Sequence, residues 1–154
     1  MKKNIATKNI VIIGAGFAGM WAALSAARLA KLQANENLNI TVLAPKAELR
    51  VRPRFYESKV RTLVSPLMPV FETMGVRFIT ATVENIQTDN KQVQFMNENG
   101  EAETVSYDKL VLASGSNLNT NIVKGINEYT FNLDQLDTAT LLDDHISNLH
   151  NQPF

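Results

Sequence analysis

The residues of this sequence best suited to chemistry are three glycines at fixed spacing near its start. They stand in the segment Gly14-Ala15-Gly16-Phe17-Ala18-Gly19. In a Gly-x-Gly-x-x-Gly loop, the first glycine permits a tight turn, the second lets a diphosphate approach the backbone, and the third lets a helix pack closely. The N–H groups and the positive dipole end of that helix hold the phosphates. The segment predicts a dinucleotide phosphate site, and the alternative is a tight turn that binds nothing.

The elements around this loop are those that such a site needs. A β-branched run, Ile10–Ile13, predicts a buried parallel strand before it. The Ala-rich segment Phe17–Gln33 predicts a helix after it, and Leu38–Leu43 predicts a second strand. Together they form one β-α-β unit of about thirty residues. The apolar stripe of the helix is expected to comprise Phe17, Met20, Leu24 and Ala27.

The rest of the chain indicates an α/β fold with further strands. Prolines between residues 44 and 70 predict a loop with short helical pieces, the last of them ending at Gly75. Strands are expected over residues 76–86, 92–96 and 103–106 as a meander, and over 109–113 as another buried strand. A final helix is expected from about residue 134 to 149. We therefore predict a Rossmann-like parallel sheet with an antiparallel β-meander, in a single domain over residues 1–154.

Composition excludes several classes of function. Fifteen basic and fifteen acidic residues give a net charge of zero, which argues against a nucleic-acid partner. The chain has no cysteine, so it contains no disulfide scaffold, thiol nucleophile or cysteine-ligated metal. No stretch is long and apolar enough to span a membrane. We expect a cytoplasmic protein with no metal site and no catalytic acid–base group of its own.

A carboxylate that usually follows the second strand is missing. That residue holds a ribose 2′-OH in many dinucleotide sites, but here Ala44 occupies the position. Three interpretations remain open. Glu48 reaches the ribose from a longer loop, a backbone group or water takes its place, or Lys46 faces a phosphorylated ribose as in NADP recognition.

Three separated features together resemble one family. They are the glycine loop, the basic and aromatic segment Arg50–Glu57, and the segment Tyr107–Ser116. The combination resembles the N-terminal FAD-binding part of the pyridine-nucleotide flavoprotein oxidoreductases, especially the type II NADH dehydrogenase-like branch. That family normally has Tyr-Asp-x-Leu-Val-x-Ala-Thr-Gly-Ser in the third feature, and Ser114 replaces its threonine here. The resemblance runs from about residue 8 to about residue 150.

The resemblance implies cofactor contacts at matching positions. The glycine loop would contact the FAD diphosphate, and Val83 would lie where the backbone meets adenine. Arg54 would lie in a loop that runs past the cofactor. The remaining expected contacts flank the ribose or end the strand under the cofactor: Ala44, Pro45, Lys46, Ala113, Ser114 and Gly115.

The resemblance also implies an activity that needs more protein than this chain. Relatives without a cysteine pair pass electrons from NAD(P)H through FAD to a quinone or another small acceptor. The chain resembles roughly the first third of such an enzyme, so we expect it to be inactive without an NAD(P)H domain or a complementing chain. One alternative is a non-catalytic regulatory module that binds NAD(H). Another is a remnant without cofactor, in which an exposed sheet edge or apolar face would drive formation of a homo-oligomer.

Overall fold

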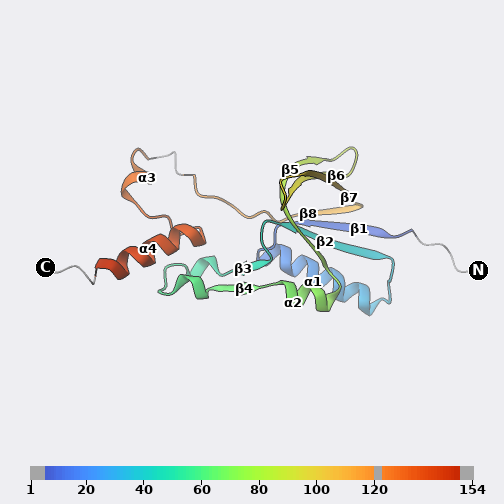
Figure 1. Cartoon of the computed structure of the whole chain (residues 1–154). Helices are drawn as coiled ribbons and strands as arrows, with labels where there is room; N and C mark the ends of the chain where they lie inside the picture. Colours follow the sequence, from blue (N-terminus) through green and yellow to red (C-terminus); the bar gives the residue numbers. More distant parts are fainter. Residues whose placement is uncertain (1–5, 120–122, 150–154) are drawn as a thin grey trace, which may run out of the picture. The chain divides into compact units, whose positions relative to one another are not determined.

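The computed structural model describes residues 6–119 and 123–149 (Figure 1). The chain divides into two compact units, which are described separately. The first unit comprises Met1–Leu49 and Pro66–Gly115, and the second comprises Arg50–Ser65 and Ser116–Phe154.

A six-stranded sheet forms the centre of the first unit, with the order β7-β6-β5-β2-β1-β8. The four strands β5, β2, β1 and β8 are parallel to one another, and β5, β6 and β7 form an antiparallel meander. The predicted Rossmann-like sheet with a meander is confirmed. The strands are β1 (Lys8–Ile13), β2 (Leu38–Ala44), β5 (Arg77–Gln87), β6 (Gln92–Asn97), β7 (Ala102–Ser106) and β8 (Lys109–Leu112).

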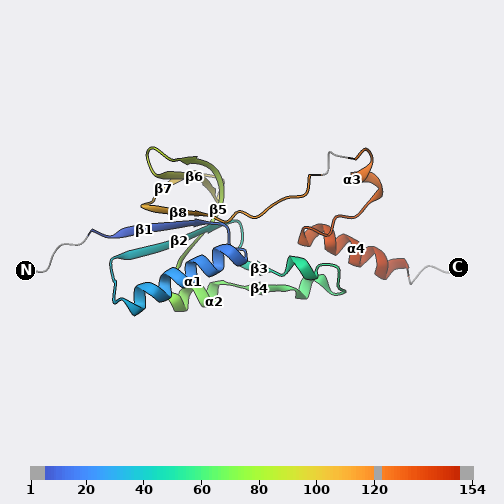
Figure 2. The same cartoon turned by 180° about the vertical axis from the view of Figure 1, so that it is seen from behind.

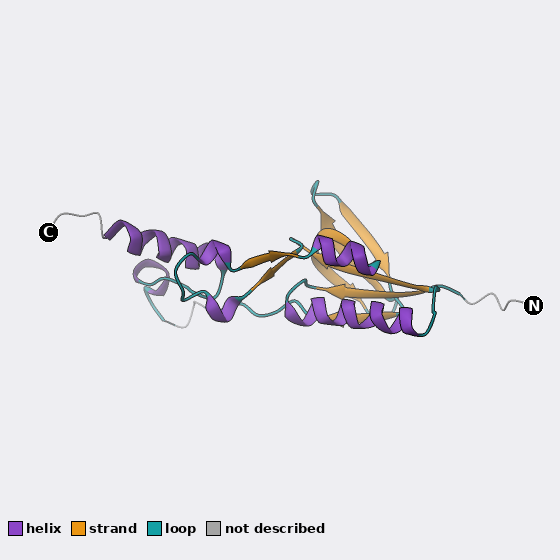
Figure 3. Ribbon diagram, turned by 90° about the horizontal axis from the view of Figure 1, so that it is seen from below, coloured by secondary structure: helices purple, strands orange, loops and turns teal. Residues whose placement is uncertain are grey.

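Two helices cover one face of this sheet (Figure 3). Helix α1 (Phe17–Leu32) is Ala-rich, and the short helix α2 (Met68–Met74) has a proline in its first turn and ends at Gly75 in the left-handed conformation. The face of α1 that packs on the sheet comprises Met20, Ala23 and Ala27. The expected stripe was therefore wrong at Phe17, which is 48% exposed, because it is the first residue of α1 and directly follows the glycine loop.

The meander covers the opposite face of the same strands (Figure 2). Strand β5 makes this possible because it changes partner along its length. Thr80 pairs with Ala44 of β2, whereas the residues from Ala81 onward pair with β6, with a bulge between Val83 and Asn85. The core beneath the meander contains Val11, Ile13, Leu43, Ala81, Val93 and Phe95.

The second unit is small and mostly helical. Its core contains Phe55, Val60, Leu63 and Ala139. The helix expected from about residue 134 begins at residue 136. A two-stranded sheet, β3 with β4, lies where a loop with helical pieces was expected, so that prediction was wrong for these two strands. The strands β3 (Glu48–Arg50) and β4 (Val64–Pro66) each contain a boundary between the two units, and the helical elements of the second unit are η1 (Arg52–Arg54), η2 (Val60–Thr62), α3 (Ile126–Tyr129) and α4 (Leu136–Leu149).

Candidate functional site

The glycine loop joins the end of β1 to the start of α1. The N–H of Gly14 donates a hydrogen bond of 2.8 Å to the carbonyl of Leu43 on β2. Gly14 has a φ of +104°, a backbone conformation that residues with a Cβ atom rarely adopt. The chain thereby turns directly from the strand into the helix, as the sequence predicts.

Two of the three glycines are required by the protein's own packing. A Cβ atom added at Gly14 would lie 2.2 Å from the carbonyl oxygen of Ala113. A Cβ atom at Gly19 would lie 1.9 Å from the carbonyl oxygen of Gly14. Both obstacles are backbone atoms, which cannot move aside as a side chain can. These two glycines therefore bring the loop, α1 and the end of β8 together.

Gly16 differs from the other two glycines because nothing in the protein requires it. Its φ of −71° and ψ of −172° suit any residue. No atom lies within 4 Å of a Cβ added there. Space is left open at the backbone where the helix begins.

The start of α1 can receive an anion at this space. Gly16 is its N-cap residue and supplies no side-chain hydrogen bond, and the first turn carries no acidic residue. The first intrahelical bond runs from the N–H of Met20 to the carbonyl of Gly16 at 2.8 Å. The N–H groups of Phe17, Ala18 and Gly19 therefore have no acceptor within the helix. Such a helix end attracts phosphate through its N–H groups and its dipole.

The end of β8 lies against the same loop. The N–H of Ala113 donates to the carbonyl of Ile13 at 2.8 Å, so Ala113 follows β8 beside the start of the glycine loop. Strand β8 lies on one side of β1 and β2 on the other, which makes this the point where the strand order reverses. Ligands of open α/β sheets bind outside the carboxyl ends of the strands at such a point. Residues 14–19 and Ala113, Ser114 and Gly115 are therefore neighbours.

The end of β2 shows a buried small residue followed by exposed ones. Ala44 is 5% exposed, and Pro45 and Lys46 after it are exposed. Glu48 lies farther along, in β3. Val83 lies in β5 three residues beyond Thr80, the partner of Ala44, and packs against the core beneath the meander.

Arg54 belongs to the second unit, where it forms an ion pair within its own loop. Its Nε and Nη2 donate to the two carboxylate oxygens of Glu57 at 2.7 and 2.6 Å. The hydrogen bond from Arg54 lowers the pKa of the Glu57 carboxyl, and the same bond raises the pKa of Arg54. This bidentate contact occupies the guanidinium in the structure.

Sequence reasoning missed the structural role of Asp108, which links β8 to β1. Its carboxylate accepts bonds of 2.8 Å from the ammonium group of Lys8 and from the N–H of Asn9. The N–H of Asp108 donates to the carbonyl of Asn9 at 2.8 Å. The bond from Lys8 is the main reason why the pKa of Asp108 is lowered. The Tyr-Asp pair before the buried strand was the available signal.

Comparison with known proteins identifies the family. Residues 8–150 match the family described as pyridine nucleotide-disulphide oxidoreductase. The chain belongs to this family. It is 36% identical over 149 residues to the NADH dehydrogenase-like protein Rv1812c of Mycobacterium tuberculosis, covering 94% of this chain and 36% of that protein. It is 27% identical over 146 residues to the type II NADH:quinone oxidoreductase of Staphylococcus haemolyticus, covering 92% of this chain and 34% of that protein. The chain thus spans about a third of the length of these relatives.

Solved structures confirm the fold. NDH2 from Plasmodium falciparum, determined in complex with NADH, superposes with a TM-score of 0.76 at 15% identity, over 96% of this chain and 31% of that one. The sulfide:quinone oxidoreductase of Aquifex aeolicus gives a TM-score of 0.76 at 24% identity, over 96% and 33%.

Among the described residues, no helix combines the length and apolarity needed to cross a bilayer. Within the same residues, no three or more His, Cys, Asp or Glu side chains are grouped so that they could hold a metal ion.

Proposed function

We propose that this chain is the FAD-binding portion of an NADH dehydrogenase-like flavoprotein oxidoreductase. In this proposal the diphosphate of FAD lies against Gly16 and accepts hydrogen bonds from the first turn of α1. Both units are taken as parts of one FAD-binding domain. The family match and the relatives named NADH dehydrogenase-like support the oxidoreductase class.

Gly16 is the observation that carries the proposal. A glycine that is required neither by its backbone angles nor by packing is explained by a ligand that occupies the space beside it. A side chain at this position would fill the approach to the N–H groups of Phe17 and Ala18. The residues present therefore fit a diphosphate.

The other residues are proposed to orient the cofactor. Pro45 and Lys46, which follow Ala44, would flank the adenosine ribose, and Val83 would present its backbone toward adenine. Because Ala44 has no carboxylate, the ribose would be held by Glu48, by Lys46, or by backbone and water. Arg54 would reach the cofactor only if its bond to Glu57 opened. The end of β8 would pass under the cofactor at Ala113, Ser114 and Gly115.

The chemistry of the complete protein would come from the flavin, which accepts a hydride from NAD(P)H and passes electrons to a quinone or another small acceptor. This chain would bind and orient the cofactor and exclude water from the diphosphate. Relatives are about three times as long, so we propose that the NAD(P)H site lies in further chain or in a complementing chain.

The proposal is tested by titrating the chain with FAD and, separately, with NADH. Trp21 is the sole tryptophan and lies in α1 one turn after Phe17, so its fluorescence should be quenched when flavin binds nearby. Saturable quenching by FAD, with flavin retained after gel filtration, is the expected result. Binding of NADH but not FAD by the folded chain would instead support a regulatory NAD(H) module. Binding of neither would overturn the proposal.

A further inference from the structure

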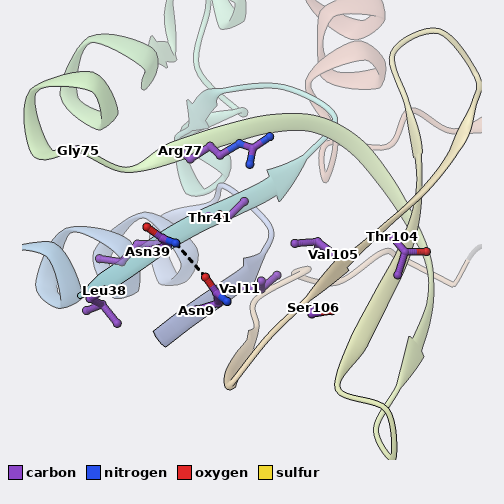
Figure 4. A pocket seen from close by; sticks show the side chains of 11 residues that line it. Asn9, Val11, Leu38, Asn39, Thr41, Gly75, Arg77, Thr104, Val105 and Ser106 are labelled. Carbon is purple, nitrogen blue, oxygen red and sulfur yellow. Dashed lines mark hydrogen bonds between the residues drawn. The ribbon is translucent and has the colours of Figure 1, made fainter. Parts of the chain in front are cut away.

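A second cleft lies in the first unit, away from the glycine loop. It has a volume of about 430 Å³ and lies on the meander side of the sheet, near the amino ends of β1, β2 and β5 (Figure 4). Its floor includes Asn9 and Asn39, and its wall is formed by Thr104, Val105 and Ser106 of β7. Asn9 lies five residues before Gly14, which at the usual rise per residue of a β-strand separates the cleft from the glycine loop by roughly 16 Å.

The meander face of β1 and β2 changes from apolar to polar along the strands, and the polar end of this face lines the cleft. Ile13 and Leu43 pair beneath the meander and are buried. The next row on the same face pairs Val11 with Thr41, and Thr41 with Arg77 of β5. The last row pairs Asn9 with Asn39. The opposite face of both strands contributes isoleucine and valine to the core under the helices.

Several polar groups in the cleft have bonding capacity left over. The Nδ2 of Asn39 donates to the Oδ1 of Asn9 at 3.0 Å, which leaves the amide N–H₂ of Asn9 and the Oδ1 of Asn39 available (Figure 4). Thr41 is only 7% exposed, and its hydroxyl has no hydrogen-bond partner within the described part of the chain. Among the described residues no fully buried side-chain N or O atom lacks a partner, so the unpaired hydroxyl of Thr41 is open to the cleft.

Arg77 supplies a positive charge beside these groups. Its side chain lies above Thr41 in Figure 4, and the guanidinium forms no ion pair among residues 6–119 and 123–149. Arg77 also lines an adjoining hollow together with Glu98 and Glu103, but it forms no ion pair with either of them. None of the described residues that line the cleft itself is acidic. The electrostatic character of the cleft therefore favours an anion over a cation.

We propose that this cleft binds a small organic anion. A carboxylate or phosphate of the ligand would accept bonds from the guanidinium of Arg77, which presents paired donors suited to either group. The Thr41 hydroxyl would bond the same group, and a polar group at the other end of the ligand would meet Asn9 and Asn39. A volume of about 430 Å³ lies within the usual range for small-molecule sites. The proposal is independent of flavin binding because the two sites use different residues.

The test is a titration of the ¹⁵N-labelled chain with succinate, inorganic phosphate and AMP in separate samples. At least one of the three probes is expected to shift amide signals saturably at millimolar concentration. The shifts are expected at the backbone amides of Asn9, Thr41, Arg77 and Thr104 and at the side-chain amides of Asn9 and Asn39. The three probes distinguish a carboxylate ligand from a phosphate and from a phosphate ester. Shifts confined to residues 14–19 and 44–46 would indicate the dinucleotide site instead and would overturn the proposal.

Substitutions in the cleft, compared with a control substitution outside it, test whether the proposed residues bind the anion. Arg77→Gln should weaken binding at least tenfold, about 1.4 kcal/mol, and Thr41→Val, which removes the hydroxyl, should also weaken it. Arg28→Gln on the exposed face of α1 is the matched control and should bind like the parent chain. No saturable shift with any of the three probes, or equal binding by the Arg77 variant with a dispersed spectrum, would refute the proposal.

Discussion

Replacing Gly16 with serine should separate ligand binding from folding in the glycine loop. Gly16 has ordinary backbone angles and open space at its Cβ position. Serine is at least as good an N-cap as glycine, and it restricts the unfolded chain more than glycine does. The free energy of unfolding should therefore stay within about 0.5 kcal/mol of the parent value or rise slightly. Binding of FAD should weaken at least tenfold, about 1.4 kcal/mol, because the new side chain occupies the space proposed for the diphosphate.

Alanine at Gly19 should have the opposite effect. Its Cβ atom would lie 1.9 Å from the carbonyl oxygen of Gly14, so the loop and α1 must move apart. Overpacking costs about 1–3 kcal/mol, and a contact with backbone this short belongs at the upper end. The better helix propensity of alanine returns up to about 1 kcal/mol. The expected net destabilisation is therefore about 2 kcal/mol. Gly14→Ala adds the strain of its positive φ to a similar clash and should destabilise more.

Urea unfolding followed by circular dichroism gives the stability of each variant, and quenching of Trp21 gives its affinity for FAD. Gly16→Ser should unfold with the parent chain and fail to bind, whereas Gly19→Ala should unfold at lower urea concentration. Two results would refute the reasoning. One is a Gly16→Ser chain that is as unstable as Gly19→Ala, and the other is a stable Gly16→Ser chain that binds FAD as the parent does.

Three further predictions concern stability. Lys8 lowers the pKa of Asp108, so the unfolded chain binds this proton more tightly, and stability should be full above about pH 4 and lost as pH falls through the lower folded pKa. Thermal unfolding between pH 3 and pH 7 should show less of this loss for Asp108→Asn; equal acid sensitivity in both chains would contradict it. Phe71 is fully buried against β2 and β5, so Phe71→Ala should lower the free energy of unfolding by about 3–5 kcal/mol in urea, and a change below about 1 kcal/mol would contradict the packing. Arg52 donates a hydrogen bond to the carbonyl of Ser116 at 3.2 Å and forms an ion pair with Asp134, which precedes α4. Arg52→Gln should therefore speed amide hydrogen exchange around residues 116–119 and 134–138, while exchange in the strands of the six-stranded sheet stays unchanged. Unchanged exchange in these segments would show that the contact is dispensable.

The parallel part of the fold could be predicted because its signals are local. A β-branched run, a glycine loop and an Ala-rich helix together define the β-α-β unit, and the meander follows from turn residues between alternating strands. The sheet of β3 and β4 could not be predicted because each strand has three residues and prolines lie nearby. The exposure of Phe17 was missed because helical periodicity gives the spacing of a stripe but not whether its first residue, next to a loop, is packed.

The candidate site also has features that the local sequence predicts and features that depend on distant parts of the chain. The roles of Gly14 and Gly19 follow from the motif, and the structure gives each a specific backbone contact. The partner of Arg54 is three residues away and could have been proposed, but the contact of Arg52 with residue 116 depends on distant chain. The cleft at Asn9 and Asn39 could not be predicted because it depends on register between two strands and on how far the meander extends.

The central claim is that the glycine loop and the end of β8 bind the diphosphate part of FAD. The most direct measurement is an amide spectrum of the ¹⁵N-labelled chain recorded during titration with FAD. The account predicts saturable shifts at residues 14–19 and 113–115, with Asn9 and Arg77 unaffected. A folded chain whose amides at these positions do not respond to FAD would contradict the account.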